Sequence, residues 1–449
     1  MIEQSRYHCE LAWLGGDVAA ADVLVTVGGD RIIAIDVGVP PAAGVVRLAG
    51  ITLPGLANAH SHAFHRVLRG RTQAGTGSFW TWREQMYALA ARLDPESYHR
   101  LARAVYGEMA LAGITCVGEF HYLHHDVGGA AYADPNAMGE ALIAAAHEAG
   151  LRITLLDTCY LRGGFDAPLH PVQQRFSDGD SLAWAARASS LQAATAGTDG
   201  ARIGAAIHSV RAVAPVDIAV VAAWAADAVA PLHAHVSEQP VENEQCHAAY
   251  GCTPTALLGD RNALSERFTA VHATHLTEGD IGLLGTSGCV ACVCPTTERD
   301  LADGIGPARA LRDAGAHLAL GSDSQAVIDL FEEARGVEMN ERLASRVRGN
   351  HDAPSLLRAA TAAGHASLGW PDAGSLAVGA YADLVTVRTD SPRMAGTDAA
   401  HVAESVVFAA TAADVVHVVI GGRVVVCDAR HNHLDVAGEL ARAIREVTT

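Results

Sequence analysis

Lysine is absent from this 449-residue chain, so that all 32 of its basic residues are arginine. The absence excludes a lysine Schiff base, a P-loop lysine on a nucleotide phosphate and a lysine-bridged two-metal centre. Charged residues make up only 18% of the chain, and 50 acidic against 32 basic residues give a net charge of −18. Such a charge repels phosphate backbones and anionic membrane surfaces, so we expect no nucleic-acid partner.

Long apolar runs and a cysteine framework are missing as well. The longest apolar stretch, around residues 216–232, contains Asp217 and Asp227 and is too polar for a membrane span. The nine cysteines are scattered, and the N-terminal MIEQSRYHCE lacks the basic and apolar segments of a secretory signal. We therefore expect a cytoplasmic protein with reduced thiols and no membrane partner. Half of the residues are hydrophobic, which excludes disorder by composition.

Short β-type runs occur near both ends of the chain. Residues 11–50 contain DVLVTV, RIIAIDV and GVVRLAG, and residues 375–426 contain ADLVTVR and DVVHVVIGGRVVV. Glycine and proline punctuate both regions, as expected of short antiparallel strands. This texture predicts one small, discontinuous β-sandwich domain formed by residues 1–53 and 371–449.

Between these regions, apolar runs of strand length alternate with helical segments. The alternation is typical of parallel strands joined by crossover helices. We expect eight strands, at residues 51–60, 114–120, 151–158, 201–209, 230–236, 268–275, 289–294 and 316–323. The predicted fold class is therefore α/β, with a (β/α)8 TIM-type barrel over residues 54–370.

Polar residues cluster where the predicted strands end, and in such barrels the loops at the strand carboxyl ends build the active site. One histidine at a strand end is more often a core residue than a ligand, but repetition around one rim favours a site. The residues are His60 and His62, Glu119 and His121, His208, His233 and His235, His272 and His275, and Asp323.

Four of these residues form a candidate metal site. In an extended segment, residues i and i+2 point to the same side, so His60 and His62 can present two imidazoles to one cation. His235 and Asp323 would join them from the fifth and eighth strands. Three nitrogens and one oxygen suit Zn2+ and leave a position for water, although Fe2+ or another divalent metal remains an alternative.

Two further strings could be mistaken for metal sites. Cys289 and Cys292 form a CxxC pattern, but no second cysteine pair follows, so we expect packing in a buried strand. The HHD string at residues 124–126 is interpreted as a solvated or hydrogen-bonded turn.

Longer strings carry a resemblance to a known family. The amidohydrolase superfamily, in its deaminase branch, has metal-site motifs similar to PGLANAHSHAF, HAHVSEQ, VHATH and GSDSQ. More narrowly, the N-formimino-L-glutamate deiminases of histidine degradation resemble this chain in SFWTWREQMYALAARLDPE, GEFHYLHHD, IHSVRAV, CPTTERDLADG and DLFEEAR. The likeness runs over nearly the whole chain. It implies a mononuclear Zn2+ enzyme that turns N-formimino-L-glutamate and water into N-formyl-L-glutamate and ammonia.

The resemblance also implies roles for individual residues. The family's metal ligands correspond to His60, His62, His235 and Asp323. In the family motif the ligand histidine stands three positions before the glutamate, here Glu238, which selects His235 over His233. Glu238 corresponds to the proton shuttle and His272 to the histidine beside the attacking hydroxide. Asp323 can accept the first proton.

Substrate contacts are implied at Arg83, Tyr122, His208 and Arg211, which fall on positions around the glutamyl carboxylates. Two carboxylates call for fixed cationic forks, and a guanidinium pairs bidentately with a carboxylate. The chain departs from the family at His65, where a glutamine that helps hold a carboxylate is usual. Substrate preference or affinity could differ for that reason.

Two other functions stay open at this point. A nucleobase or nucleoside deaminase of the same superfamily would share the metal and the glutamate but would read an aromatic ring and would not need two arginines. A catalytically inactive barrel scaffold would keep the fold, although the intact ligand set and Glu238 argue against it. The partner we expect is a small-molecule dicarboxylate, and by analogy with such barrels we expect a homodimer.

Overall fold

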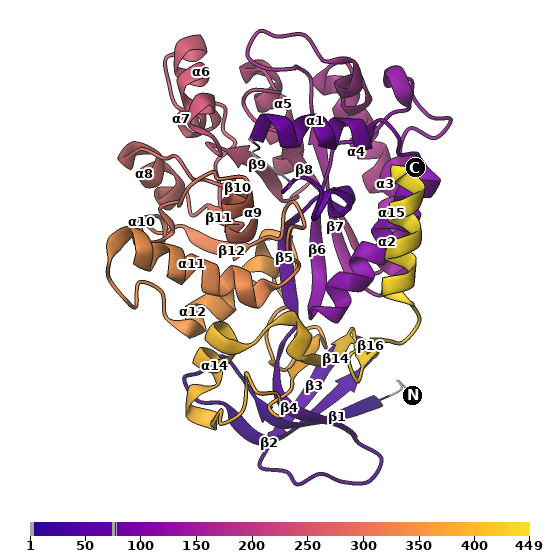
Figure 1. Cartoon of the computed structure of the whole chain (residues 1–449), viewed down its shortest axis with the longest axis vertical. Coiled ribbons are helices and arrows are strands. Elements are labelled where there is room, and N and C mark those ends of the chain that lie inside the picture. Colours follow the sequence, from indigo (N-terminus) through magenta and orange to yellow (C-terminus); the bar gives the residue numbers. More distant parts are fainter. Residues whose placement is uncertain (1–3, 74–76, 78) are drawn as a thin grey trace.

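The computed structural model describes residues 4–73, 77 and 79–449. Its strands form two eight-stranded sheets, one in the middle of the chain and one built from both ends. Figure 1 shows the first sheet surrounded by helices in the upper part of the molecule and the second sheet below it. Within the described ranges, no helix combines the length and the apolar character needed to cross a membrane.

The first sheet is a barrel of parallel strands in sequence order. Its two edge strands meet where Asp323 N donates to His60 O at 3.0 Å and His62 N donates to Asp323 O at 3.1 Å. The predicted barrel is thereby confirmed. Its strands are β5 (Leu56–Ser61), β6 (Ile114–His121), β7 (Arg152–Cys159), β8 (Ala201–Ile207), β9 (Leu232–Val236), β10 (Phe268–His272), β11 (Val290–Val293) and β12 (His317–Leu320).

The first predicted strand, residues 51–60, is wrong as a single strand. The chain leaves the second sheet at the end of β4 (Val46–Pro54) and enters the barrel at β5. Gly55 lies at the change of sheet, where a side-chain Cβ would clash with Thr115 Oγ1. The two sheets therefore join within one continuous apolar run, which is why its sequence pattern looks like one strand.

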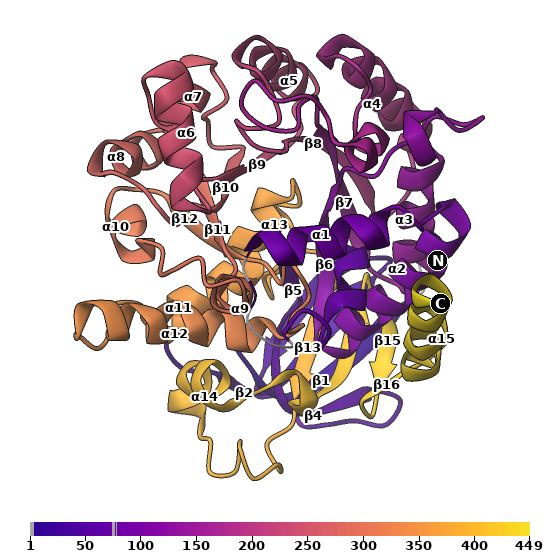
Figure 2. The same ribbon diagram turned by 45° about the horizontal axis from the view of Figure 1, so that its top comes forward.

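Helices cover the outside of the barrel (Figure 2). One example of a sequence-encoded start is α2, where Asp94 Oδ1 accepts from Ser97 N at 2.7 Å and Pro95 occupies the first turn. The helices between the barrel strands are α1 (Phe79–Ala90), α2 (Pro95–Leu111), α3 (Ala137–Glu148), α4 (Ser181–Thr195), α5 (Pro215–Asp227), α6 (Pro240–Tyr250), α7 (Pro254–Asp260), α8 (Glu278–Thr286), α9 (Pro295–Asp300) and α10 (Ala308–Asp313). After the last barrel strand come α11 (Leu330–Ser345), α12 (Ala353–Arg358), α13 (Gly364–Ser367) and α14 (Val402–Ala409).

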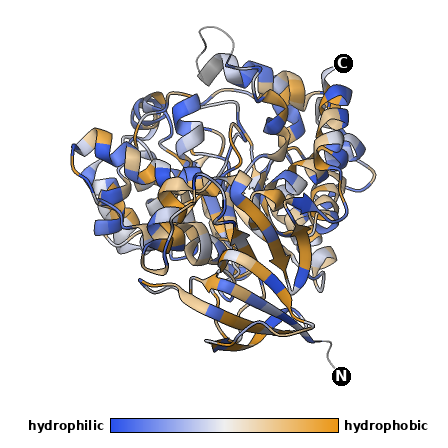
Figure 3. Ribbon diagram, turned by 60° about the horizontal axis from the view of Figure 1, so that its bottom comes forward, coloured by the Kyte–Doolittle hydropathy of each residue, from blue (hydrophilic) through white to orange (hydrophobic). Residues whose placement is uncertain are grey.

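The second sheet has its own core, rich in valine and leucine. Its N-terminal and C-terminal parts are also joined outside the ladders, because Tyr7 OH donates to Gly422 O at 2.7 Å and Ile32 N donates to Ala380 O at 2.9 Å. Figure 3 shows apolar residues running along these strands. The sheet joins β1 (Gln4–Ala12), β2 (Ala20–Gly28), β3 (Arg31–Val37) and β4 to β13 (Leu384–Val387), β14 (Val415–Ile420), β15 (Arg423–Cys427) and β16 (Arg430–His431).

The C-terminal helix α15 (Val436–Thr448) returns from the second sheet to the barrel and packs along α2 (Figure 1). Leu440, Ala443 and Val447 form its buried face. Arg103 Nη2 on α2 lies 2.9 Å from Glu439 Oε2 on α15. The C-terminal helix is thus tied to the outside of the barrel.

Candidate metal centre and cavity

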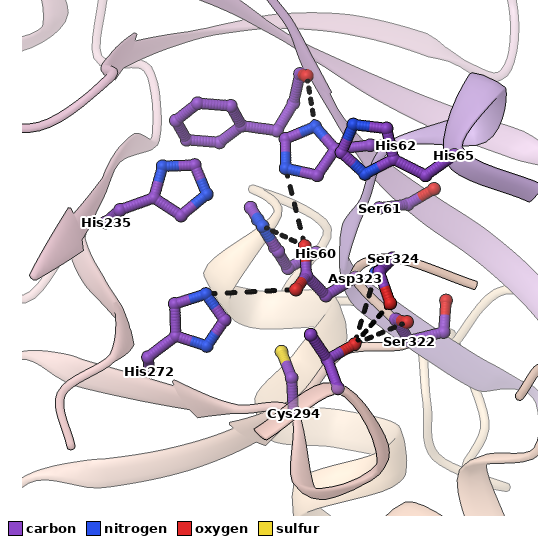
Figure 4. Close-up of polar contacts among 12 residues, drawn as sticks. His60, Ser61, His62, His65, His235, His272, Cys294, Ser322, Asp323 and Ser324 are labelled. Carbon is purple, nitrogen blue, oxygen red and sulfur yellow. Dashed lines mark hydrogen bonds and ion pairs between the residues drawn. The ribbon is translucent and has the colours of Figure 1, made fainter. Parts of the chain in front are cut away.

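Histidines and one aspartate converge at the carboxyl ends of the barrel strands (Figure 4). His60 lies in β5, His235 in β9 and His272 at the end of β10, and Asp323 follows β12. Ligand atoms of these four residues all lie within 4.8 Å of one another. His62, just after β5, belongs to a second such group that shares Asp323 with the first and also includes His65.

Asp323 is the centre of the arrangement. Its Oδ1 lies 3.2 Å from His60 Nε2 and 3.4 Å from His62 Nε2, and its Oδ2 lies 3.9 Å from His272 Nε2. His62 and His272 approach the carboxylate from different sides (Figure 4). Two ligand atoms of one tetrahedral zinc ion, each about 2.0 to 2.2 Å from the metal, are about 3.3 to 3.6 Å apart. The two shorter distances fit a shared cation.

Backbone carbonyls orient two of the imidazoles. His62 Nδ1 lies 3.0 Å from Phe120 O, and His235 Nδ1 lies 2.8 Å from His208 O. A carbonyl at Nδ1 selects the tautomer that carries its hydrogen there and leaves the Nε2 lone pair for a metal. Both ring nitrogens of His60 are buried; Nε2 faces Asp323 Oδ1 at 3.2 Å, and Nδ1 has no hydrogen-bond partner in the described part of the chain. Unpaired buried nitrogens are costly unless a ligand occupies them.

Burial also fixes the charge states that a metal site needs. It lowers the pKa of His60, His62 and His235, so these imidazoles are neutral near pH 7 and their lone pairs are available. Burial would raise the pKa of Asp323, but the surrounding histidines outweigh it and hold that pKa below its usual range. Three neutral nitrogens beside one carboxylate are donors of the chemistry that a divalent cation such as zinc takes.

A polar network beneath the cluster holds its two halves together. Asn58 Nδ2 donates to Ser322 Oγ at 2.6 Å, and Ser322 Oγ donates to Gln325 Oε1 at 2.7 Å. Gln325 Nε2 then donates to Ser61 Oγ at 2.8 Å, and Ser61 Oγ donates to Glu119 Oε2 at 2.7 Å. The network thereby links the segment of His60 and His62 to the loop that follows β12. Asp323 lies in that loop with a positive φ of 41°.

Several polar residues at the strand ends take no part in the cavity. Glu119 also accepts from Ala63 N at 2.7 Å and so supports the turn that follows β5. His233 Nε2 lies 3.0 Å from Ser367 O, and His275 Nε2 lies 2.7 Å from Asp303 O. His121 is buried against the His124 ring instead, at 4.8 Å between ring centroids. Strand-end position alone did not separate these residues from the ones that face the cavity.

One cavity lies above the cluster, and Figure 2 shows α1 across this end of the barrel. It brings together every predicted site residue except His60, which is fully buried. The predicted residues in its wall are His62, His65, Arg83, Tyr122, His208, Arg211, His235, Glu238, His272 and Asp323. Tyr87, Tyr160, Arg162 and Phe176 line it too and were not foreseen.

Two of the predicted substrate residues, Arg211 and His65, make polar contacts in the cavity wall. Arg211 Nε is 3.9 Å from Glu242 Oε2, a buried carboxylate at the start of α6. Burial lowers the pKa of Arg211, but Glu242 and Glu238 raise it by more, so the guanidinium stays charged. His65 Nε2 lies 3.0 Å from Tyr122 OH, and His65 Nδ1 has no hydrogen-bond partner among the described residues.

Comparisons with known proteins agree with this architecture. A model of the amidohydrolase family matches residues 51–425. The formimidoylglutamate deiminase of Pseudomonas aeruginosa is 40% identical over 401 residues, which cover 87% of this chain and 88% of that protein. An amidohydrolase structure from Brucella melitensis has a TM-score of 0.92 and 33% identity over 99% of this chain and 100% of that one. An adenosine deaminase from Xanthomonas campestris with bound zinc has a TM-score of 0.85 and 26% identity, over 98% and 97% of the two chains.

A parallel barrel with a histidine and aspartate cluster at the carboxyl ends of its strands, able to hold a divalent metal ion, is the architecture of a barrel hydrolase. The chain belongs to the amidohydrolase family and is a hydrolase that acts on carbon–nitrogen bonds.

Proposed function

We propose that the protein is a Zn2+-dependent deiminase that converts N-formimino-L-glutamate and water to N-formyl-L-glutamate and ammonia. The observation that carries this proposal is a single cavity that joins the histidine and aspartate cluster to Arg83 and Arg211. A linear amidine with two carboxylates needs both features, one at the reacting carbon and one at its acidic tail. The relative with 40% identity, named for this activity, supports the choice of substrate.

In this proposal His60, His62, His235 and Asp323 hold the ion. When bound, zinc supplies a hydroxide nucleophile near neutral pH, because it lowers the pKa of water from 15.7 to about 7. Asp323, whose pKa is held low, accepts a proton only in the course of the reaction, and its two oxygens face the histidines on either side.

Glu238 delivers the proton that decides which bond breaks. Its Oε1 lies 3.8 Å from His272 Nε2, and burial raises its pKa although His272 and Arg211 oppose that shift. The carboxyl group can therefore hold a proton until the tetrahedral centre forms. An amine leaves readily only once it is protonated. Protonation of the terminal nitrogen by Glu238 releases ammonia and leaves the bond to the glutamyl nitrogen intact.

His272 stabilises the negative charge that develops on the oxygen that adds to the formimino carbon, a contribution that is typically about 3 kcal/mol for one well-placed donor. At the other end of the cavity, Arg83 and Arg211 each pair with one substrate carboxylate. Tyr122 and His208, whose ring centroids are 5.6 Å apart, lie between the two ends. His65 takes the place of the family's glutamine and reaches the cavity beside Tyr122.

A nucleobase or nucleoside deaminase is the second candidate, because aromatic side chains also line the cavity. Trp82, Tyr87, Tyr122, Tyr160 and Phe176 offer ring faces on which a planar base could stack. The structural neighbour that is an adenosine deaminase belongs to this type. A neutral base has no group that calls for the three arginines of the same wall, Arg83, Arg162 and Arg211, which favours the dicarboxylate.

A substrate panel with ammonia detection on zinc-loaded protein tests the proposal. N-formimino-L-glutamate is compared with N-formiminoglycine, which keeps the amidine and one carboxylate, and with adenosine, guanine and related bases. We expect kcat/KM to be about 30- to 150-fold lower for N-formiminoglycine, because one charged hydrogen-bonded pair of about 2 to 3 kcal/mol is lost. Faster ammonia release from any base than from N-formimino-L-glutamate would overturn the assignment. A protein that binds zinc but releases no ammonia from any of them would support the inactive scaffold.

A further inference from the structure

Glu298 touches His272 from the side that faces away from the cavity. It lies in α9, which follows β11, and is 4% exposed, while His272 is 1% exposed. Glu298 Oε1 lies 3.5 Å from His272 Nδ1. In the described part of the chain Nδ1 has no hydrogen-bond partner, and Glu298 is the acidic group within ion-pair distance of it.

The Glu298 carboxylate is itself anchored. Its Oε1 accepts from Cys294 N at 2.8 Å, a backbone group that precedes the first turn of α9. An oxygen that is held by the backbone cannot follow the imidazole if the ring turns. It therefore places a fixed negative charge 3.5 Å from Nδ1.

The backbone at His272 needs such support. His272 and Ala273 have positive φ angles of 66° and 51°, a left-handed conformation that side-chain-bearing residues rarely adopt. This conformation ends β10 and turns the imidazole into the cavity, where Nε2 lies 3.8 Å from Glu238 Oε1 and 3.9 Å from Asp323 Oδ2. Because the imidazole is rigid, a contact that fixes Nδ1 also fixes the direction of Nε2.

We propose that Glu298 is a positioning residue that holds the His272 ring in its catalytic orientation through Nδ1. This inference rests on the proposed function of the site, in which His272 Nε2 faces the reacting atoms. Glu298 itself does not line the cavity and does not touch the substrate. Loss of its carboxylate should therefore slow turnover without weakening substrate or metal binding.

Helix stabilisation is the competing explanation, and the chain offers a matched control for it. Glu333 on α11 is fully buried and anchors the same first turn of α9: its Oε2 accepts from Thr296 N at 2.9 Å, and its Oε1 accepts from Thr296 Oγ1. No ion pair or hydrogen bond joins Glu333 to His272 in the described residues. Removing either carboxylate disturbs α9, but only Glu298 reaches the histidine.

The experiment compares Glu298→Ala, Glu298→Gln and Glu333→Gln with the wild-type enzyme for kcat and KM on N-formimino-L-glutamate, zinc content and melting temperature. We expect Glu298→Ala to lower kcat about 100-fold with KM within about threefold and one zinc retained. Glu298→Gln keeps an oxygen for Cys294 N and Nδ1 and should lose about tenfold. Glu333→Gln should lower the melting temperature and leave kcat within about twofold. A kcat of Glu298→Ala within threefold of wild type, or parallel losses of kcat in the Glu298 and Glu333 variants, would overturn the inference.

A crystal structure of the zinc-loaded Glu298→Ala variant separates this inference from the proposed function. A His272 ring that has rotated away from Glu238 and Asp323 supports the positioning role, whichever substrate the enzyme turns over. A ring that stays in place overturns it. Absence of ammonia release from N-formimino-L-glutamate by the wild-type protein, in contrast, rejects the proposed function and leaves the crystallographic result to decide the role of Glu298.

Discussion

Two buried clusters of histidines and aspartates lie in this barrel, and they differ in what compensates their charge. Behind β7, Arg187 binds two carboxylates with both forks of its guanidinium, at 2.7 and 2.8 Å to Asp157 and at 2.7 and 2.9 Å to Asp178. His125 Nε2 joins Asp178 Oδ1 at 3.1 Å. At the cavity, the ion pairs that Asp323 makes among the described residues are with histidines, such as His60.

The two clusters differ in whether the buried carboxylate has a permanent cation among the protein's own side chains. Burial would raise the pKa of Asp178, but His125 and Arg187 lower it well below the usual range, so that cluster is complete. Burial lowers the pKa of His60 and His62, so these two imidazoles are neutral near pH 7. His272 is charged, because nearby carboxylates raise its pKa against the effect of burial, but its single positive charge is shared by Glu238, Glu298 and Asp323. A buried charge is tolerated only when it is paired or bound to a metal. The first cluster is structural, and the second is prepared for a cation.

The largest effect is expected from Asp323→Ala, which removes the centre of the cavity cluster. Bound zinc and ammonia release should both fall below detection, because the three remaining neutral nitrogens lack the negative charge that the carboxylate contributes to binding of a divalent ion. Metal analysis by mass spectrometry and the ammonia assay check this. His125→Ala, in the other cluster, is the control and should keep its zinc; retained turnover in Asp323→Ala would break the comparison.

Glu238→Gln should separate metal binding from chemistry within the cavity. Glutamine keeps the shape of the side chain but cannot carry the proton, so we expect zinc at the wild-type stoichiometry and a kcat lower by about 10²- to 10⁴-fold. Single-turnover kinetics on zinc-loaded protein measure the loss. A kcat within tenfold of wild type would assign the proton transfer to another group.

Arg187→Met tests the structural cluster. Two buried carboxylates lose their common cation, and we expect the free energy of unfolding to fall by about 3 to 5 kcal/mol. Denaturant titration measures it, and zinc per folded chain should stay unchanged. Adding Asp157→Asn and Asp178→Asn to the variant removes the two unpaired charges and should restore part of the lost free energy of unfolding. A loss below about 1 kcal/mol, the range of surface ion pairs, would show that the two clusters do not differ as described.

Arg211→Ala and Arg83→Ala are expected to act on substrate binding. Each should raise KM for N-formimino-L-glutamate by about 30- to 150-fold with little change in kcat, since the lost contact serves ground state and transition state alike. Steady-state kinetics over a wide substrate range resolve the two constants. N-formiminoglycine lacks one of the two carboxylates. Replacing the arginine that binds this missing carboxylate should therefore change the KM for N-formiminoglycine much less than the KM for N-formimino-L-glutamate. An unchanged KM in both variants would remove the arginines from the site.

His65→Gln should have the smallest effect. It restores the residue that is usual in the family and keeps a donor or acceptor for Tyr122 OH. We expect kcat/KM on N-formimino-L-glutamate to stay the same or to rise by about fivefold or less, the equivalent of one neutral hydrogen bond of about 1 kcal/mol. A collapse of activity at unchanged zinc content would mean that His65 has a role of its own.

Local patterns were sufficient for much of the barrel. Apolar runs such as that of β7 predict buried parallel strands. The spacing of His60 and His62 predicts two imidazoles on the same side of an extended segment. The same kind of pattern failed at Gly55, because a strand that changes sheets keeps one continuous apolar sequence. Glu298 lies in the string CPTTERDLADG, but that string does not indicate its proposed role, which depends on contact with His272 from a different strand.

The residues of HHD at 124–126 and of HSH at 60–62 illustrate the same limit. Both strings carry closely spaced histidines, and the turn interpretation of the first agrees with His124 Nε2 lying 2.9 Å from Thr158 O. The sequence contains Arg187 and Asp178 far from this string, and no periodicity connects them to it. Only the tertiary structure shows that the guanidinium of Arg187 compensates the carboxylates beside the HHD string.

The sequence by itself determined the alternation of strands and helices, the pairing of histidines at the end of β5 and the chemical types of donor available, because these depend on neighbours within a few residues. The tertiary structure alone decided which of the strand-end residues face one cavity, where the chain passes from one sheet to the other, and which buried carboxylate has an arginine. Those outcomes depend on contacts between strands and helices far apart along the chain, and charge compensation in the interior is settled by such contacts.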